Sequence, residues 1–256
     1  MISKSRIKYI QSLQNKKVRD DEHLYVIEGE KLVKEYLLSG VRLRLLAAKP
    51  EFIASLKPEE KEAIDGFESA SNEDLKRMSS LKSPQNALAI VPIPAGSSDL
   101  PEITDSLCIA LESVQDPGNL GTIIRAAAWF GFRHIVCSVN SVDVYNPKVI
   151  QASMGAILNV KVHYYDLQEF LGFACKNKLP VYGTFLEGKS VYASELGNMG
   201  IILLGNESRG ISADLLPYIT EKLVIPRFNS YIHGVESLNV GMAASIVFSE
   251  FARRRI

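Results

Sequence analysis

The sequence predicts an α/β protein with a parallel sheet and helices on both faces, preceded by a smaller α/β domain. In the second half of the 256-residue chain, short apolar runs alternate with helical stretches, a pattern typical of parallel strands buried on both faces. Between the halves, residues 91–104 are rich in proline and show no amphipathic period, as linkers do. We therefore expect domains at 1–96 and 105–256, joined by a linker at 97–104.

The first half contains the elements of a small α/β domain. A basic helical stretch comes first, and residues 24–40 then read as a short strand that runs into a helix. Residues 42–49 and 87–93 are further strand candidates. Ser71 with Asp74 three residues later has the spacing of a capping box, with Asp in the usual Glu position, so a helix is expected to begin there.

The second half alternates more strictly. Apolar runs predict strands within 106–114, 134–139, 158–164, 179–185, 200–205 and 222–226. Helical periodicity predicts helices within 119–132, 147–155, 166–178, 212–219 and 237–255. In sheets of this kind ligands bind at the carboxyl ends of the strands, so polar residues that follow these strands are the first candidates for a site.

The composition is that of a soluble globular protein, with 46% hydrophobic and 23% charged residues. The N-terminus has no apolar segment of a signal peptide and no window approaches the length of a membrane span. We therefore expect a cytoplasmic protein with no membrane association. The three cysteines, Cys108, Cys137 and Cys175, show neither a CxxC pair nor zinc-ligand spacing, which predicts reduced thiols and no metal.

The formal net charge is zero, which argues against a protein that coats nucleic acid nonspecifically. The first 19 residues nevertheless carry six Lys or Arg and no acidic residue, and three arginines stand near the C-terminus. A local basic surface can contact phosphates even on a neutral chain. A solvated helix face explains the same charges equally well.

The first polar cluster follows the strand at 106–114. Residues 116–118 (Asp-Pro-Gly) form a turn, and Asn119 is placed to cap the next helix. Arg125 lies six residues later and can lean back toward the helix N-terminus, where anions bind well. Taken alone, this cluster is better explained as a cap and a surface ion pair.

The second cluster follows the strand at 200–205. Asn206, Glu207 and Arg209 stand between Gly205 and Gly210. Glu207 could cap the short helix that follows, or the loop could form part of a site in which Gly205 lets the backbone approach a ligand.

The third cluster combines a strand end at residues 225–226 with the start of the last helix. Ser237 is a natural N-cap, which places Asn239 in the first turn. Small residues at 241–245 allow close approach to another backbone or to a ligand. Tight helix packing and a ligand site are both compatible with them.

Several common sites are missing. The sequence has no GxGxxG fingerprint after the first strand of either half, no GxxxxGK[ST] phosphate loop and no GxSxG elbow. The four histidines give no metal pattern: His23, His134, His163 and His233.

Together and in this order, the three clusters resemble the motifs of the SpoU (TrmH-like) branch of the SPOUT RNA methyltransferases. The matching segments are N-L-G-x-x-x-R at 119–125, L-G-N-E-S-x-G at 204–210, and I-P at 225–226 followed by E-S-L-N-V at 236–240. The first half, with "VIEGEKLVKEYL" and "SPQNALAIV", more loosely resembles the small RNA-binding domain related to ribosomal protein L30e that precedes many of these enzymes.

The resemblance implies a SPOUT domain with a C-terminal trefoil knot, which periodicity cannot show. It also implies a homodimer whose active site is completed across the interface, with S-adenosylmethionine bound in the knot. The implied cofactor contacts come from the second and third motifs: Leu204, Gly205, Asn206, Ile225, Pro226, Ser237, Leu238 and Asn239. The loop at 227–236 is longer than usual in the family and Gly241 replaces a common Ser or Ala, which leaves the contacts of that loop open.

The implied reaction is methyl transfer to a ribose 2′-hydroxyl, with rRNA favoured over tRNA as the substrate. Arg125 is the implied essential group at the acceptor, and the groups that position substrate and cofactor are Asn119, Glu207, Ser237 and Asn239. Orienting the acceptor and helping to remove its proton are the tasks of such an enzyme. The alternatives are a tRNA 2′-O-methyltransferase and a non-catalytic RNA-binding factor of ribosome assembly.

Overall fold

The computed structural model describes residues 2–94, 106–228 and 236–255. The linker expected at 97–104, His233 and most of the long loop at 227–236 lie outside the described residues. The chain forms two compact units. Among the described residues, unit 1 contains 2–94 together with Tyr145–Leu158, and unit 2 contains 106–144, 159–228 and 236–255.

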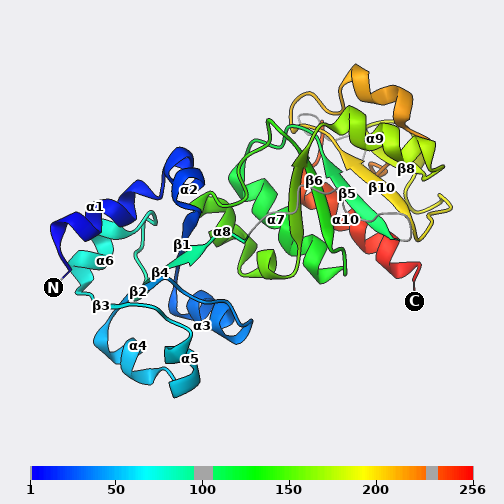
Figure 1. Ribbon diagram of the computed structural model, residues 1–256. Helices are drawn as coiled ribbons and strands as arrows, with labels where there is room; N and C mark the ends of the chain where they lie inside the picture. The colour runs from blue at the N-terminus through cyan, green and yellow to red at the C-terminus, as the bar shows by residue number, and fades with distance from the viewer. Residues whose placement is uncertain (1, 95–105, 229–235, 256) are drawn as a thin grey trace. The chain divides into compact units, whose positions relative to one another are not determined.

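Unit 1 is built on a mixed sheet of four strands in the order β1-β4-β2-β3 (Figure 1). The strands are β1 (Leu24–Glu28), β2 (Leu45–Ala48), β3 (Phe67–Ser69) and β4 (Ala87–Pro92). The helices are α1 (Lys4–Ser12), α2 (Lys16–Glu22), α3 (Glu30–Leu38), α4 (Pro50–Ser55), α5 (Pro58–Glu62), α6 (Asn72–Met78) and α8 (Pro147–Ser153), with the 3-10 turn η1 (Ala156–Leu158). Strand β4 is antiparallel to β1 and β2, whereas β2 and β3 are parallel.

The side chains of this sheet alternate between two apolar clusters. Ile27 and Leu46 belong to one cluster and Val26 and Leu45 to the other, so both faces are buried. The capping box predicted at Ser71 is present: Ser71 Oγ accepts the N–H of Asp74 at 3.1 Å, and the Asp74 carboxylate accepts the N–H of Ser71 at 3.1 Å. The short elements β3, α4 and α5 were not predicted.

The segment Tyr145–Leu158 packs with unit 1, although the sequence places it within the expected domain 105–256. The ring of Tyr145 lies 4.7 Å from that of Tyr25, centroid to centroid. Ile150 is 2% exposed in the core beside β1 and α3. Burial of these apolar side chains explains why the segment joins this core and not that of unit 2.

Unit 2 is built on a sheet of seven strands in the order β7-β6-β5-β10-β8-β11-β9, and every neighbouring pair is parallel. The strands are β5 (Leu107–Leu111), β6 (His134–Ser138), β7 (Lys161–Tyr165), β8 (Val181–Phe185), β9 (Lys189–Ser190), β10 (Gly200–Leu204) and β11 (Glu221–Val224). The predicted parallel sheet is confirmed. The two-residue strand β9 was not predicted because it is too short to show a period.

Helices cover both faces of this sheet, as predicted (Figure 1). On one face, α9 (Leu167–Lys176) and the 3-10 helix η2 (Ala213–Tyr218) pack over the alternate residues Cys108 and Ala110 of β5. On the other face lie α7 (Pro117–Trp129) and α10 (Val240–Arg253). The ring centroids of Phe248 and Phe132, just beyond α7, are 4.9 Å apart, and Phe251 meets Tyr182 of β8 edge-on at 5.1 Å.

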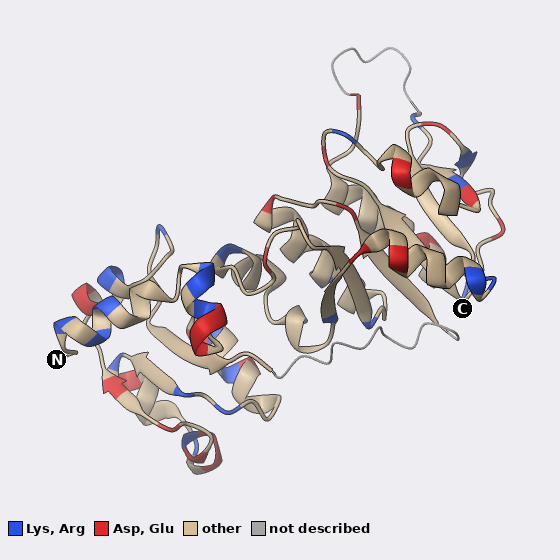
Figure 2. Ribbon diagram, turned by 45° about the horizontal axis from the view of Figure 1, so that its top comes forward, with Lys and Arg blue, Asp and Glu red and all other residues tan. Residues whose placement is uncertain are grey.

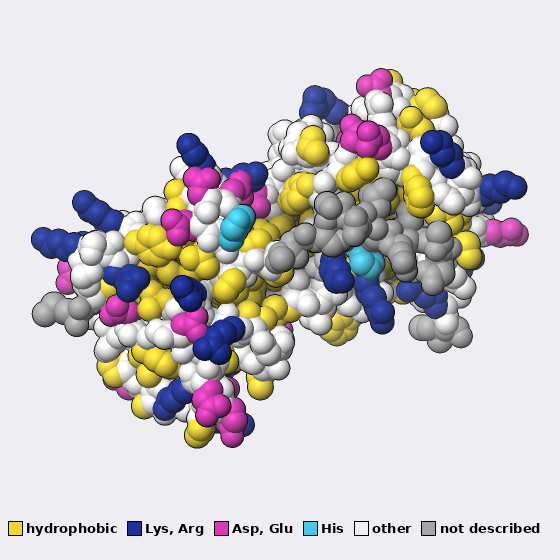
Figure 3. Space-filling view, in the orientation of Figure 1, with side chains coloured by type: hydrophobic (Ala, Val, Ile, Leu, Met, Phe, Trp, Pro, Cys, Tyr) yellow, Lys and Arg dark blue, Asp and Glu magenta, His cyan; other side chains and the backbone are white. Residues whose placement is uncertain are grey.

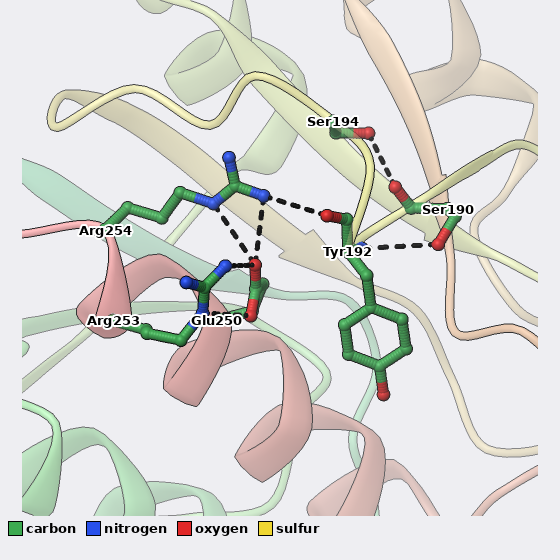
Figure 4. A network of polar contacts seen from close by, with 6 residues as sticks. All are labelled: Ser190, Tyr192, Ser194, Glu250, Arg253 and Arg254. Atoms are coloured by element: carbon green, nitrogen blue, oxygen red, sulfur yellow. Dashed lines mark hydrogen bonds and ion pairs between the residues drawn. The ribbon is translucent and has the colours of Figure 1, made fainter.

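The C-terminal end of α10 is fixed by a buried carboxylate (Figure 4). Glu250 is 7% exposed and accepts hydrogen bonds from Arg253 Nη2 at 2.7 Å and Arg254 Nη2 at 3.0 Å. Arg254 Nη2 also donates to the main-chain oxygen of Tyr192 at 3.1 Å. The hydrogen bonds from Arg253, followed by those from Arg254, hold the pKa of Glu250 below its usual range, since they stabilise its charged form. The contacts tie α10 to the segment that follows β9.

No helix in the described part of the chain is long and apolar enough to cross a membrane. Cys108 and Cys137 are buried, as their apolar surroundings predict, whereas Cys175 is exposed. Burial raises the pKa of the Cys137 thiol to about 12. The two buried thiols therefore act as small apolar side chains.

Candidate active site

An open pocket of about 720 Å³ lies where β5 and β10 end and α7 and α10 begin. Its lining is entirely polar or charged: Gln115, Asp116, Asn119, Asn206, Glu207, Ser208, Arg209 and Asn239. This is the carboxyl edge of the parallel sheet, where the fold is expected to place a ligand. Four of the predicted site residues line it: Asn119, Asn206, Glu207 and Asn239.

A chain of side-chain hydrogen bonds joins all three sequence clusters. Asn239 Nδ2 donates to Asn119 Oδ1 at 2.8 Å, across 120 residues of sequence. Asn119 Nδ2 donates in turn to Glu207 Oε1 at 3.0 Å, across 88 residues. The side-chain amide of Asn119 therefore accepts a hydrogen bond from the third cluster and donates one to the second cluster.

Asn206 shapes the loop that carries Glu207. Its Nδ2 donates to the main-chain oxygen of Ser113 at 2.7 Å, and its Oδ1 accepts the N–H groups of Ser208 and Arg209 at 3.0 and 3.1 Å. Nδ2 also lies 3.3 Å from Glu207 Oε2. One amide thus ties the loop after β10 to the loop after β5 and fixes the position of the carboxylate next to it.

Two glycines allow this loop to close. The main chains of Asn206 and Gly210 exchange hydrogen bonds of 3.0 and 2.9 Å, and Gly210 has a φ of +67°, which glycine adopts readily. A Cβ on Gly205 would lie 2.2 Å from the carbonyl carbon of Gly210. The structure therefore requires glycine at 205 because the chain folds back on itself, a reason that is independent of any ligand.

Both helices at the pocket begin at positions that differ from the prediction. Helix α7 starts at Pro117 with Asp116 as its N-cap, and Asp116 Oδ1 accepts the N–H of Asn119 at 2.8 Å. The prediction that Asn119 is the cap is wrong, because proline, which lacks an N–H, suits the first position of the helix. The side chain of Asn119 is thereby available to the pocket.

Helix α10 starts at Val240, and its N-cap is Asn239 instead of the predicted Ser237. Asn239 Oδ1 accepts the N–H groups of Gly241 and Met242 at 2.9 and 3.3 Å. Asn is as good a cap as Ser, and this start places Val240, 8% exposed, at the first helical position. The cap and the contact to Asn119 use different atoms of the same amide.

The two helices run in the same direction, with both N-termini at the pocket. Their first residues are joined through Asn119 and Asn239, and Phe132 and Phe248 meet toward their far ends. A helix N-terminus carries about half a positive charge, so two of them favour negative charge here. Two carboxylates, Asp116 and Glu207, line the pocket at these helix ends.

Other predicted residues lie outside the lining. Arg125 is exposed on α7, and Ser237 and Leu238 are exposed before α10. Ile225 and Pro226 are half-buried just beyond β11. Leu204 and Gly205 are buried at the end of β10, where their main chain borders the pocket loop.

The lining also contains residues that the sequence did not single out as site residues: Gln115, Asp116, Ser208 and Arg209. Each is adjacent to a predicted motif residue or within a few positions of one. Ser208 is a defined position and Arg209 the variable position of the second motif, whereas Gln115 and Asp116 precede the first motif, so adjacency to the motifs is the signal that could have indicated all four.

Comparison with known proteins identifies the family of this chain. Residues 106–249 match the model of the SpoU rRNA Methylase family, and residues 4–89 match an MRM3-like substrate binding domain. The chain belongs to the SpoU rRNA methylase family. The prediction of a SpoU-type RNA methyltransferase is therefore confirmed, and the small N-terminal domain corresponds to a substrate-binding module.

Three relatives illustrate the family. The 23S rRNA (guanosine(2553)-2′-O)-methyltransferase RlmP of Bacillus subtilis is 28% identical over 243 residues, covering 94% of both chains. A solved structure assigned to the TrmH family of RNA methyltransferases, from Porphyromonas gingivalis, is 38% identical, with a TM-score of 0.86 and 99% coverage of both chains. An rRNA methyltransferase of Sinorhizobium meliloti, solved with S-adenosylmethionine bound, is 25% identical, with a TM-score of 0.83 and coverage of 100% and 97%. The predicted cofactor agrees with that structure.

Proposed function

We propose that the protein transfers a methyl group from S-adenosylmethionine to a ribose 2′-hydroxyl of rRNA. One observation carries the proposal: Asn239, Asn119 and Glu207, one from each motif, form a single hydrogen-bonded chain at the carboxyl edge of the sheet. The named relative RlmP acts on 23S rRNA, which favours rRNA as the substrate.

The residues present fit the cofactor. Main-chain groups at Leu204, Gly205, Ile225, Pro226 and Leu238 would hold its adenine and ribose, as the family resemblance implies; β10 ends beside the pocket, and β11 is the second strand from it in the sheet. Apart from Ser208 and Arg209, the pocket lining consists of amides and two carboxylates, and the carboxylates suit the sulfonium and ammonium groups of the cofactor. S-adenosylmethionine supplies a methyl group that is bonded to a sulfonium sulfur, and the neutral thioether formed by the transfer is a good leaving group.

The polar side chains position the acceptor. Asn239 donates to Asn119, which in turn donates to the Glu207 carboxylate. In this proposal the oxygens of Glu207 accept a hydrogen bond from the ribose hydroxyl. Arg125 engages an RNA phosphate or the acceptor hydroxyl, and Ser237 contributes at the cofactor side. Orientation of this kind can contribute most of the rate enhancement.

The active form is proposed to be a cytoplasmic homodimer with a trefoil knot in its C-terminal segment, as the family resemblance implies. The chain mass is 28.3 kDa. Light scattering after gel filtration is expected to give twice this mass. A monomer that is fully active would contradict a site completed across the interface.

The experiment compares rRNA and tRNA from a strain that lacks this protein. Each RNA is incubated with the protein and S-adenosylmethionine, and new 2′-O-methyl groups are mapped by their resistance to alkaline hydrolysis. We expect one new site in rRNA. A site only in tRNA would replace rRNA as the substrate, and absence of S-adenosylmethionine binding by calorimetry would favour a non-catalytic RNA-binding factor.

A further inference from the structure

Four nitrogen-bearing side chains gather at the amino edge of the sheet in unit 2, the edge opposite the pocket. Arg133 and His134 stand at the start of β6, and Lys161 and His163 belong to β7. Lys161 is directly opposite His134 in the parallel register, and its N–H donates to the main-chain oxygen of Arg133 at 2.8 Å. Because β7 is the outermost strand, this corner borders the open side of the sheet.

The two histidines form a stacked pair. His134 Nδ1 and His163 Nε2 are 3.3 Å apart, and their rings are inclined by 26° with centroids 5.6 Å apart. A hydrogen bond between two imidazoles requires one neutral acceptor. Burial, followed by the charges of Lys161 and Arg133, lowers the pKa of His134, and burial, His134 and Lys161 lower that of His163.

No carboxylate balances this corner within the part of the chain that the structure describes. Arg133 and Lys161 are both exposed, and neither takes part in any ion pair between described residues. No acidic residue contributes to the pKa of either histidine. Like charges held together without a counter-charge destabilise a fold, so such a cluster indicates a site for an anion.

Some basic residues of unit 1 have acidic partners. Arg6 pairs with Glu68 at 3.6 Å, and Arg42 and Arg44 pair with Asp65 at 2.6 and 3.2 Å. Basic and acidic side chains are interspersed on the face of this unit in Figure 3, and α2 carries both signs in Figure 2. In contrast, Arg133 and Lys161 flank a pair of histidines and have no ion pair among the described residues.

We propose that Arg133, His134, Lys161 and His163 form a second RNA-contact site that binds backbone phosphate at the edge of the sheet away from the pocket. The proposal rests on the proposed function, which supplies the polyanion. Strands of five residues separate the two edges by about 17 Å at about 3.3 Å per residue. A structured RNA can contact both edges at once, whereas a single nucleotide in the pocket cannot.

The test removes the two permanent charges. In the full chain, Arg133→Gln with Lys161→Gln is compared with Lys189→Gln and Lys222→Gln. The control pair lies on β9 and β11, at the other end of the strand order, and removes the same net charge. Binding of fluorescently labelled 23S rRNA fragments is measured over a series of salt concentrations.

We expect the slope of log K against log salt to become less steep by about 1.5 in the site variant, since each lost phosphate contact changes it by about 0.7 to 0.9. The control pair should change it by less than about 0.5 on the same scale. The charge-conserving pair Arg133→Lys with Lys161→Arg should keep the wild-type slope. Equal slopes in wild type and site variant, or equal losses in site and control variants, would overturn the proposal.

A second measurement uses the unaltered protein. Bound phosphate favours the protonated imidazoles, so saturating RNA should raise the pKa of His134 and His163 in NMR titrations of their ring protons. Unchanged titrations would count against the site even where a variant fails to fold. Methylation is measured separately. If the wild-type protein methylates no RNA, the proposed function is overturned, but the salt slope and the titrations still test whether this corner binds RNA phosphate.

Discussion

Replacing Asn119 by aspartate tests the hydrogen-bonded chain that joins the three motifs. The substitution keeps the acceptor for Asn239 but puts a carboxylate oxygen where Asn119 Nδ2 now lies, 3.0 Å from Glu207 Oε1. Two unit charges at that distance repel by about 1.4 kcal/mol with the screening of water and by about 5.5 kcal/mol at an effective dielectric constant of 20. Glu207 is half-buried in an open pocket, so we expect about 2 kcal/mol, or a rise of about 1.5 in one carboxyl pKa.

The sign of the pH dependence follows from that rise. A carboxyl whose pKa is higher in the folded than in the unfolded protein contributes stability below about pH 4, and that stability is lost as the pH rises through the folded pKa. The Asn119→Asp protein should therefore be less stable than wild type at pH 8 by about 2 kcal/mol, and nearly equal to it at pH 4. Urea unfolding at both pH values measures this difference.

The matched control is Asn119→Ala, which removes the same donor without adding charge. Its cost should be about 1 to 2 kcal/mol for two lost hydrogen bonds and should not depend on pH. A difference between the aspartate and alanine variants that is the same at pH 4 and pH 8 would refute the contact between positions 119 and 207.

Three further predictions concern single residues. Arg125→Ala is expected to abolish methylation and to leave S-adenosylmethionine affinity nearly intact in calorimetry, because the family resemblance places Arg125 at the RNA acceptor; a fully active variant would remove it from the mechanism. Gly205→Ala should lower the free energy of unfolding, measured in urea, by about 3 kcal/mol, since the added Cβ would lie 2.2 Å from a main-chain carbon atom. The control is Gly172→Ala in α9, which should be neutral or stabilising because the added Cβ would meet only an ordinary contact at 3.7 Å. Similar effects of the two changes would contradict the close approach. Lys161→Gln should raise the pKa of His134 in NMR titration, because the Lys161 charge is the main cause of its lowered pKa after burial. An unchanged value would show that the Lys161 charge does not act on His134.

The strands and long helices of unit 2 were predictable because their apolar runs are continuous. Strand β10 is buried along its whole length, which makes its four apolar residues visible in the sequence. The strand β9 has two residues and the segment Tyr145–Leu158 packs outside its own half of the chain. Neither the pairing of β9 nor the packing of this segment leaves a periodic signal in the sequence, because each depends on residues that are distant in the sequence.

Four of the predicted site residues line the pocket, but the predicted start of each helix was wrong. Asp116, Asn119, Ser237 and Asn239 are all good N-cap residues, so N-cap preference alone does not choose between them. In α7 the proline at position 117 sets the first helical position, and the side chain of Asn119 is then held by Glu207 and Asn239. Because these contacts join segments that are distant in the sequence, the three motifs indicate a site only when they are considered together.

The use of amides around Glu207 has a chemical consequence. Asn119 and Asn206 orient this carboxylate through neutral donors, 3.0 and 3.3 Å from its two oxygens. An arginine in either place would form a bidentate ion pair that occupies both oxygens and lowers the basicity of the carboxylate. Neutral amides fix the position of Glu207 and leave acceptor capacity on each oxygen, because a carboxylate oxygen can accept more than one hydrogen bond. The pocket therefore keeps a fixed carboxylate that can still accept a hydrogen bond from a hydroxyl, as the role proposed for Glu207 requires.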